Sequence, residues 1–315
     1  MQHRTFGTTG LRVAPIVLGG NVFGWTADEK ASFEVLDAFF GQGFNAIDTA
    51  DTYSAWAPGN RGGESETIIG RWLASRPQRR AEAVVFTKAG GDMGGPGRKG
   101  LSARWLTQSV EDSLKRLGVD AIDVHFAHFP DPDTPEEDTL RAYERMLQAG
   151  KIKAIGVSNV DAAQLSRSLQ VARDNGLTGY QVLQPEYNLY NRDAYEGALR
   201  DLCLAEDIAV VPYYALAAGF LTGKYRSEAD LGKSVRGGGI AKYLNPRGEA
   251  ILAALDQVSA AHGMGLAEVA LAWLIAQPGV NPIASATSAR QVETFGRAAA
   301  LRLTPEDMRV LTDAG

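Results

Sequence analysis

Short apolar runs alternate with longer stretches of helical periodicity along almost the whole chain. The short runs are rich in Val, Ile and Ala and end in polar residues or turns, which is typical of buried strands. The longer stretches repeat apolar residues three and four positions apart, as amphipathic helices do. The pattern predicts eight strands, at residues 15–18, 45–48, 83–88, 122–128, 154–158, 181–184, 208–213 and 282–285.

The stretches between these strands predict helices at residues 29–40, 64–73, 103–117, 135–148, 162–174, 195–206, 249–276 (two helices) and 289–298. Thr304 followed by a proline has the pattern of a helix start, so a final helix is expected. Gly41, Gly118, Gly150 and Gly176 follow helix patterns, where left-handed caps are expected. Alternating strands and helices favour an α/β fold, a closed (β/α)8 TIM barrel with an N-terminal hairpin and an extra C-terminal helix.

Length and charge narrow the class of protein. The 315 residues suit one domain, 1–315, because such barrels take about 250 residues plus insertions. The net charge of −5, with both signs interspersed, argues against a nucleic-acid partner. No apolar run approaches the roughly 18 residues of a membrane span, and no signal peptide is evident. Cys203, the single cysteine, is interpreted as a small buried residue. One cysteine cannot form an internal disulfide bond, which fits a cytoplasmic protein.

Side chains that can hold or move a proton stand at the ends of successive predicted strands. Asp48 ends the second strand and Tyr53 follows it, Lys88 ends the third, and His128 ends the fourth. Barrel active sites are built at this end of the strands. Each residue alone also fits a structural role, as a loop cap, a half-buried aromatic or a solvated strand end. Four of them at consecutive strand ends favour an acid–base site.

This set suits the reduction of a carbonyl group. Hydride delivery to carbon leaves an alkoxide that needs a proton, and a phenol with a pKa of about 10 is a slow donor near neutrality. A neighbouring ammonium lowers that pKa, and a carboxylate holds the ammonium in place. We therefore predict Tyr53 as the general acid, Lys88 as the cation that lowers its pKa and Asp48 as the partner of Lys88. His128 is expected to orient the carbonyl.

The fourth strand carries a second histidine, three residues before the first. His125 and His128 should lie about 10 Å apart along the strand and on opposite faces. We interpret His125 as an interior or helix-facing residue. No closely spaced set of His and Cys exists, so no metal site is expected.

Three long connections follow predicted strands, at residues 54–63, 89–100 and 222–248. Long loops at this end of a barrel commonly carry function. The stretch 89–100 holds six glycines but lacks the spacing of a phosphate loop or a dinucleotide fingerprint, so we interpret it as a mobile lid.

Seven segments occur in a specific order and spacing: 10–13, 48–53, 111–118 with Asp120 and Asp123, 128–130, 150–159, 184–188 and 219–225. Together they resemble the aldo-keto reductases, among them bacterial NADP(H)-dependent members and those related to potassium-channel β subunits. The resemblance covers nearly the whole chain. It implies a nicotinamide-dependent carbonyl reductase whose catalytic tetrad is Asp48, Tyr53, Lys88 and His128.

The resemblance also implies a cofactor site for NADP(H). The implied cofactor-binding residues are Gly19, Gly20, Asn21, Asp48, Ser158, Asn159, Gln184, Tyr213, Leu216, Ala217, Gly219, Lys224, Arg236, Ser285, Thr287, Arg290 and Gln291. Two departures from the family pattern are Tyr214-Ala215, where Ser-Pro is frequent, and Phe295, where Asn is usual. Arg236 and Arg290 supply positive charge for a 2′-phosphate, and no acidic residue precedes Glu293 in the last segment, so NADP(H) is expected over NAD(H).

Four aromatic residues follow strand ends on the same side and are candidate walls of the substrate pocket: Trp25, Trp56, Phe129 and Tyr214. Loop packing accounts for them equally well. A sugar, an aromatic aldehyde or a ketone would fit, in the reductive or the oxidative direction. Two other classes stay open: a cofactor-binding regulatory protein on the same fold with little turnover, and a lyase or isomerase that uses Lys88 as a Schiff-base amine.

Overall fold

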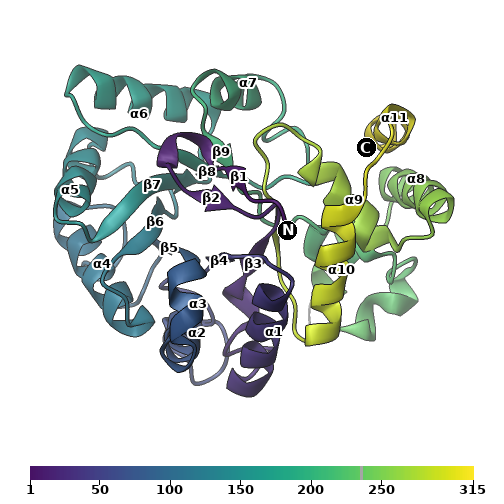
Figure 1. Ribbon diagram of the computed structural model, residues 1–315. Helices are drawn as coiled ribbons and strands as arrows, with labels where there is room; N and C mark the ends of the chain where they lie inside the picture. Colours follow the sequence, from purple (N-terminus) through teal and green to yellow (C-terminus); the bar gives the residue numbers. More distant parts are fainter. Residues whose placement is uncertain (235–236) are drawn as a thin grey trace.

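The computed structural model describes residues 1–234 and 237–315. Arg236, one of the predicted cofactor residues, lies outside the described residues. Parallel strands occupy the centre, and helices surround them (Figure 1). The strands follow the order β10-β3-β4-β5-β6-β7-β8-β9. Their bounds are β3 Val17–Gly19, β4 Ala46–Asp48, β5 Val84–Ala89, β6 Ile122–Ala127, β7 Ile152–Ser158, β8 Val182–Gln184, β9 Ala209–Val210 and β10 Ile283–Ala284.

Backbone hydrogen bonds join the two ends of this sheet. The amide of Val210 donates to the carbonyl of Gly279 at 3.0 Å, and the amide of Asn281 donates back to Val210 at 2.8 Å. One step further along, Ile283 donates to Pro212 at 2.9 Å. The predicted (β/α)8 barrel is therefore confirmed.

The helices of the described residues are α1 Glu29–Gly41, α2 Glu64–Ser75, α3 Pro77–Glu82, α4 Ala103–Leu117, α5 Glu136–Gln148, α6 Ala162–Asp174, α7 Ala198–Ala205, α8 Pro246–His262, α9 Leu266–Ile275, α10 Ala289–Ala300 and α11 Pro305–Asp313. Helix α3 was not predicted, because none of its residues is buried and its sequence has no apolar period. Gly118, Gly150 and Gly176 have the expected left-handed backbone, but Gly41 does not; Gly43, with φ 85°, takes that conformation after α1.

Short 3-10 turns connect the main elements, at η1 Gly7–Thr9, η2 Gly20–Val22, η3 Ala217–Thr222, η4 Glu228–Lys233, η5 Gly237–Gly239 and η6 Ala241–Tyr243. Three of them, η4 to η6, lie within the long connection after β9 that the sequence leaves without structure.

The alternation of side chains along the strands separates two apolar regions. Val84 and Phe86 of β5 point into the barrel and join an inner core with Val124 and Phe126 of β6. Val85, between them, faces the helices and belongs to the larger outer core. Because side chains alternate, Lys88 and His128 continue the inward-facing series, whereas His125 belongs to the outward-facing one.

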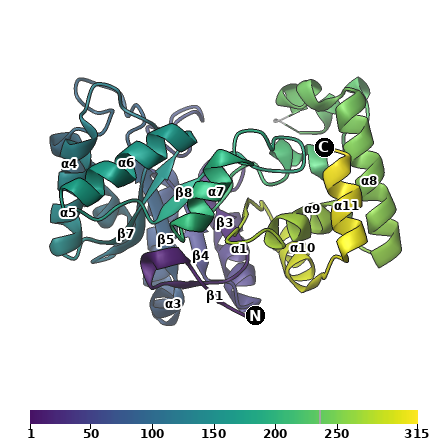
Figure 2. The same ribbon diagram turned by 90° about the horizontal axis from the view of Figure 1, so that it is seen from above.

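A small hairpin closes the amino-terminal end of the barrel. It pairs β1, Arg4–Thr5, with β2, Arg12–Val13, and lies against one end of the strands (Figures 1 and 2). Phe6 stacks on Phe86 of the inner core, with ring centres 5.5 Å apart. The side chain of Asn281 donates to the carbonyl of Ala14 at 2.9 Å. With this end covered, the carboxyl end of the strands is the open mouth.

Within the described residues, no single helix is long and apolar enough to cross a bilayer. Helices α8 and α9 meet the length and composition test only as a pair, bent by 94° at their junction.

Candidate active site

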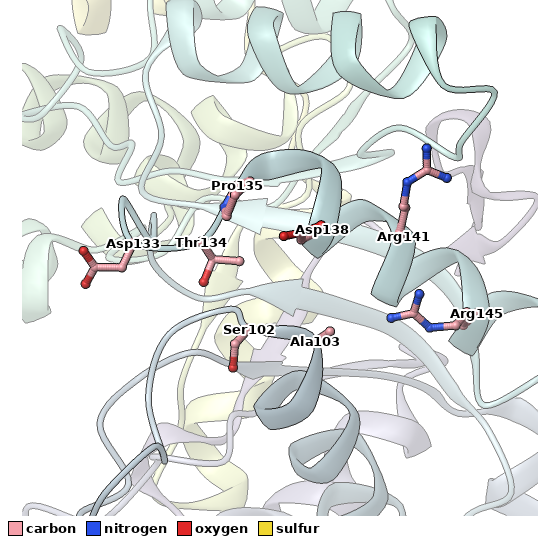
Figure 3. Close-up of a pocket in the computed structure, with 8 residues that line it drawn as sticks. All are labelled: Ser102, Ala103, Asp133, Thr134, Pro135, Asp138, Arg141 and Arg145. Atoms are coloured by element: carbon pink, nitrogen blue, oxygen red, sulfur yellow. The ribbon is translucent and has the colours of Figure 1, made fainter.

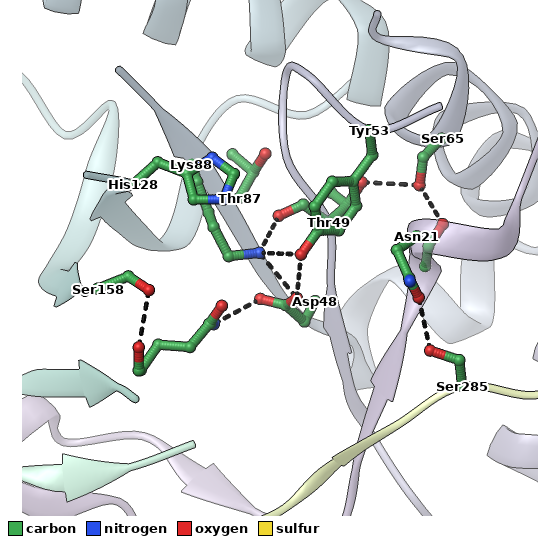
Figure 4. A network of polar contacts seen from close by, with 12 residues as sticks. Asn21, Asp48, Thr49, Tyr53, Ser65, Thr87, Lys88, His128, Ser158 and Ser285 are labelled. Atoms are coloured by element: carbon green, nitrogen blue, oxygen red, sulfur yellow. Dashed lines mark hydrogen bonds and ion pairs between the residues drawn. The ribbon is translucent and has the colours of Figure 1, made fainter. Parts of the chain in front are cut away.

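Four predicted catalytic residues meet at the barrel mouth (Figure 4). Asp48 is the last residue of β4, Lys88 lies near the end of β5, and His128 follows β6. Tyr53 lies in the turn after β4 and reaches back toward Lys88. The common inward parity of the three strand positions explains why side chains so distant in sequence converge.

Lys88 is the centre of this cluster. Its ammonium donates to Asp48 Oδ2 at 2.7 Å, to the carbonyl of Thr49 at 2.7 Å and to the hydroxyl of Tyr53 at 2.8 Å. Tyr53 in turn donates to the same carboxylate oxygen at 3.2 Å. Lys88 and Asp48 are 0% and 1% exposed, so the ion pair is fully buried. All three donors of the ammonium are used, which fixes its position.

The pKa of Tyr53 differs in direction from the sequence prediction. Burial of the phenol and the adjacent Asp48 carboxylate raise its pKa well above the ordinary value. Burial lowers the pKa of Lys88, and Asp48 opposes that shift. The predicted lowering of the Tyr53 pKa by Lys88 is therefore wrong: the ammonium lies where it was expected, but burial and Asp48 outweigh it. The phenol keeps its proton at neutral pH.

His128 lies beside Tyr53, with the ring centres 6.2 Å apart. Burial, with a smaller contribution from Lys88, lowers its pKa to about 3, so the imidazole is neutral. Nδ1 is buried and has no hydrogen-bond partner among the described residues. A bare ring nitrogen is easier to bury unpaired than an N–H group, so we assign the proton to Nε2.

His125 faces the helices, as predicted. Its Nδ1 lies 3.2 Å from the hydroxyl of Tyr143 on α5, and burial lowers its pKa to about 3. Its Nε2 has no hydrogen-bond partner within residues 1–234 and 237–315, so this histidine is only partly satisfied. It does not belong to the barrel mouth.

A second polar group lies beside the tetrad, at the ends of the next strands. Gln184 donates to Asp48 Oδ1 at 2.9 Å, and Ser158 donates to the backbone carbonyl of Gln184 at 2.7 Å (Figure 4). Asn159 donates to the carbonyl of His128 at 2.8 Å and accepts from the hydroxyl of Tyr213 at 2.8 Å. Among the described residues, none bonds to Oε1 of Gln184. That oxygen can therefore accept from a carboxamide, as the predicted nicotinamide site requires.

The predicted residues at the end of β3 and directly after it pack against their own chain. A Cβ atom on Gly19 would lie 2.5 Å from Ser285 Oγ, and one on Gly20 would lie 2.9 Å from Ser65 Oγ. Asn21 accepts a hydrogen bond from Ser285 at 2.6 Å, which joins the first and last strand ends of the barrel (Figure 4). The two glycines let the backbone pass between Asp48 and Ser285.

The segment after β9 is strained. Ala217 and Ala218 have φ angles of 47° and 56°, and Gly219 follows with φ 104°. Leu216 precedes this turn. The ammonium of Lys224 lies 3.6 Å from the position that a Cβ on Gly219 would take. The predicted pyrophosphate segment thus has a left-handed turn with the ammonium of Lys224 beside it.

Residues predicted for the adenine end lie at the start of α10. The side chain of Gln291 accepts from the amide of Thr287 at 2.9 Å. Arg290 is exposed and forms no ion pair with a described residue. Phe295, which stands in place of the usual Asn, is 2% exposed and packs edge-on against Phe39. Its ring is part of the core, so it offers no contact to adenine.

Two of the four predicted pocket aromatics contact residues of the tetrad, and the other two contact neighbouring aromatic rings. Trp56 contacts the ring of Tyr53 edge-on at 6.1 Å, and Trp25 contacts Trp56 edge-on at 5.7 Å. Phe129 stacks on His128 at 4.4 Å, and Tyr214 contacts Tyr213 at 5.2 Å. Trp56, Phe129 and Tyr214 are 51%, 46% and 49% exposed, unusually high for large apolar side chains. Exposed apolar groups gathered at one mouth are typical of a binding site.

A separate hollow lies between the starts of α4 and α5 (Figure 3). Its lining residues are Ser102, Ala103, Asp133, Thr134, Pro135, Asp138, Arg141 and Arg145. None of the predicted site residues lines it. Across the part of the chain that the structure describes, there is no group of three or more His, Cys, Asp or Glu side chains placed to hold a metal ion.

Sequence reasoning missed two residues near the tetrad. The backbone carbonyl of Thr49 accepts from Lys88, a contact that no side-chain pattern reveals. Asp51 is 1% exposed, and neither carboxyl oxygen has a hydrogen-bond partner among the described residues. Its position in the same polar run as Asp48 was visible, but an acid three residues past a strand end gives no sign of burial.

Comparison with known proteins agrees with this arrangement. The sequence pattern of the aldo/keto reductase family matches residues 15–314. The chain therefore belongs to this family of oxidoreductases, whose members generally use a nicotinamide cofactor and act on small-molecule carbonyl substrates.

Individual relatives are similar over most or part of the chain. A probable voltage-gated potassium channel subunit β of Oryza sativa subsp. japonica is 32% identical, covering 93% of this chain and 89% of that protein. The aldo-keto reductase YhdN of Bacillus subtilis (strain 168) is also 32% identical, covering 98% and 92%. An uncharacterised 11.2 kDa protein of Pseudescherichia vulneris is 61% identical over 93 residues, which are 30% of this chain and 90% of that protein.

Proposed function

We propose that this chain is an NADP(H)-dependent reductase that converts an aldehyde or ketone to the alcohol. The observation that carries this proposal is the hydrogen bond between Lys88 and Tyr53, held in place by the buried Asp48 carboxylate. It sets a protonated phenol beside a fixed cation at the open end of a barrel. We further propose that residues 1–315 form one such domain and that it works in the cytoplasm, which fits the single cysteine.

Tyr53 is the proposed proton donor. Its raised pKa keeps the proton on the phenol until the carbonyl oxygen gains negative charge. An alkoxide is a far stronger base than a phenolate, so transfer from the phenol is favourable even with that pKa. The phenolate left behind lies 2.8 Å from the ammonium of Lys88, which stabilises it as a cation that is itself fully buried.

His128 is the proposed orienting group. Its neutral ring, with the proton on Nε2, donates a hydrogen bond to the carbonyl oxygen without competing as an acid. Phe129, stacked on the ring, holds it in place.

The described residues fit a nicotinamide cofactor. Ser158, Asn159 and Gln184 present amide and hydroxyl groups suited to its carboxamide, and Tyr213 offers a ring face beside them. Gly19, Gly20, Asn21 and Ser285 are proposed contacts on the ribose side, and Leu216, Ala217, Gly219 and Lys224 along the pyrophosphate. Thr287, Arg290, Gln291 and Arg236 are proposed for the adenosine 2′-phosphate. When bound, this cofactor supplies the hydride.

The exposed aromatics favour a substrate with an apolar, planar part. Trp56 adjoins Tyr53 and Phe129 adjoins His128, so a ring between them would place its carbonyl against both polar groups. Burying such a ring between two half-exposed aromatics supplies binding energy through removed apolar surface. We propose an aromatic or other bulky apolar aldehyde ahead of a sugar.

The test has two stages. NADPH binding is measured by fluorescence, and oxidation of bound NADPH is then followed by absorbance after addition of an aromatic aldehyde, an aliphatic ketone or an aldose. We expect binding and turnover, fastest with the aromatic aldehyde, and no turnover with Tyr53→Phe. Cofactor binding with no turnover on any carbonyl would contradict catalysis and favour a regulatory role. No cofactor binding would contradict both.

A further inference from the structure

A second buried acid, Asp51, lies beside the backbone of Lys88. Asp51 is 1% exposed, and its backbone amide donates to the carbonyl of Lys88 at 3.1 Å. Within the described residues, neither oxygen of its carboxyl group has a well-formed hydrogen bond, and the adjacent backbone amide of Thr52 lowers its pKa less than burial raises it. A buried carboxylate with too few donors is expensive to ionise, so this position favours the neutral acid.

The charged and titratable groups that interact with Asp51 come from α2, α4, β5 and α5. Glu66 of α2 accepts from Thr87 and from Arg116 of α4, each at 2.6 Å, so the nearest arginine is already paired. The ammonium of Lys88 on β5 already donates its three hydrogen bonds to Asp48, Thr49 and Tyr53.

Burial, and to a smaller extent Tyr180 and Asp51, raise the pKa of Tyr143 on α5, so this phenol is neutral. The hydroxyl of Tyr143 contacts His125 of β6, which is also neutral. Among the described residues, Arg116 and Lys88 lower the pKa of Asp51 only in part, because each cation is already paired with another carboxylate. Burial, and after it Glu66, raise the pKa of its carboxyl group to about 8.

The charges around Lys88 decide what ionisation of Asp51 would do. With Asp51 neutral, Lys88 and Asp48 cancel, and loss of the Tyr53 proton takes this group from zero to one negative charge. With Asp51 ionised, the same step would leave two negative charges in a buried site. Like charges close together in a low dielectric oppose ionisation strongly, so the phenol would become a poorer proton donor.

On the basis of the function proposed above, we propose that Asp51 is a positioning residue whose carboxyl group must stay neutral for Tyr53 to release its proton. Asp51 touches neither substrate nor the reacting oxygen in this arrangement; it acts through the field around Lys88. Its ionisation, and not that of Tyr53 or Lys88, then sets the alkaline limit of carbonyl reduction.

The experiment is a pH profile of kcat/KM for carbonyl reduction in the unmodified protein and in Asp51→Asn. Above the midpoint near pH 8, the unmodified protein should lose about tenfold in rate per pH unit, as expected for one essential protonated group. Asp51→Asn has a permanently neutral side chain, so its decline should begin about one pH unit or more higher. Glu66→Gln should move the decline to lower pH, because Glu66 raises the pKa of Asp51.

Asp123→Asn is the matched control. Asp123 is also a buried acid, 2% exposed, but it is paired with Lys153 at 2.7 Å and lies at the far end of β6. Its substitution should leave the alkaline limit unchanged. A purely structural effect of removing a buried acid would lower the rate in both variants without moving the limit in either.

An unchanged limit in Asp51→Asn would overturn this inference. A shift of the alkaline limit to lower pH in Asp51→Asn would also overturn it. That variant removes a charge that raises the pKa of Lys88, so such a shift would show that deprotonation of Lys88 sets the limit. Absence of reduction by the unmodified protein would instead contradict the proposed function. Infrared spectra separate failure of this inference from failure of the proposed function. The carbonyl stretch of a protonated carboxylic acid should be present at pH 7 in the unmodified protein and lost in Asp51→Asn. Its absence from the unmodified protein would overturn the inference, whatever the activity.

Discussion

Lys88 donates a hydrogen bond to the hydroxyl of Tyr53 at 2.8 Å, and its ammonium lies only 4.4 Å from the centre of the same ring. The cation therefore contacts both the oxygen that titrates and the ring that carries it. An ammonium near the face of an aromatic ring is attracted to it, and here it is also tied to Asp48 and Thr49. Neither partner can move without breaking several contacts, so we expect substitutions of either to be poorly compensated.

Tyr53→Phe should abolish carbonyl reduction and leave NADPH affinity nearly unchanged. The phenol acts on the proton, and removal of a general acid lowers rates by about 10² to 10⁴. Lys88→Met should lower the rate similarly, because the phenolate loses its nearest cation. Stopped-flow reduction rates and fluorescence titrations measure the two effects separately. Retention of most turnover in Tyr53→Phe would show that another group donates the proton.

His128→Ala offers a contrast within the same site. Its proposed role is orientation, so we expect a smaller loss of kcat and an altered preference among aldehydes. His125→Ala, on the opposite face of the same strand, should not reproduce the change in preference, because it faces Tyr143.

Arg290→Ala and Arg236→Ala should each weaken NADPH binding by about tenfold while changing NADH binding little. A charge-assisted hydrogen bond to a phosphate contributes roughly 1.5–3 kcal/mol, and NADH lacks the 2′-phosphate. Arg290 is exposed in the first turn of α10, and Arg236 lies outside the described residues. Arg309→Ala on α11 is a suitable control. Equal or tighter binding of NADH by the unmodified protein would contradict the NADP(H) preference and leave the reductase proposal intact.

His125→Phe should make the protein less sensitive to acid. The pKa of His125 in the folded chain is about 3, below the ordinary unfolded value of about 6.5. The unfolded state therefore binds a proton that the folded state does not, and stability falls as pH falls from 6.5 toward 3. One histidine contributes up to about 1.4 kcal/mol per pH unit in this range.

The measurement is the free energy of unfolding in urea at pH 6.5 and pH 5. The difference in free energy of unfolding between the unmodified protein and the variant should change by up to about 2 kcal/mol, in favour of the variant, when the pH is lowered from 6.5 to 5. His128 also lowers the free energy of unfolding as the pH falls, and Asp51 raises it. Both residues are present in each protein, so their effects cancel in the difference between the two proteins. His3→Gln, near the amino terminus, is the control.

Ala218→Gly should stabilise the protein or leave its stability unchanged, against the usual effect of such a substitution. Ala218 has φ 56° and ψ 15°, a left-handed conformation that disfavours a Cβ by about 1 kcal/mol. Ala253→Gly, at an exposed interior position of α8, should destabilise by about 1 kcal/mol. Urea denaturation of the two variants compares them directly. Equal destabilisation by both would show that Ala218 is not strained.

Periodicity in the sequence was sufficient to predict the barrel, because its strands and the helices that pack on them each have a buried face. Helices 103–117 and 162–174 have their predicted bounds, and each predicted strand overlaps an observed one. Helix α3 was missed because it buries nothing, and its polar residues give no signal. The left-handed turn after α1 was assigned to Gly41 instead of Gly43, because two glycines follow the same apolar pattern and only the packing decides between them.

The candidate site was predicted in its residues but not in its electrostatics. Strand parity places Asp48, Lys88 and His128 on one inward face, and this parity can be read from the sequence. The direction of the Tyr53 pKa was predicted wrongly, because burial depends on loops and neighbours that the sequence does not position. The roles of the tetrad, the cofactor residues and the pocket aromatics stay predictions until the variants above are measured.

The contacts of Asn281 with Ala14, across 267 positions, and of Val17 with Pro282 place the first and last strands side by side. During synthesis the amino-terminal hairpin and β3 leave the ribosome early, but the strand that covers the open side of β3 is among the last to emerge. Such distant pairing forms slowly, since a very long loop must close first. Until β10 arrives, β3 presents a bare edge that other chains can pair with, so a nascent or truncated chain needs protection from aggregation that the finished barrel does not.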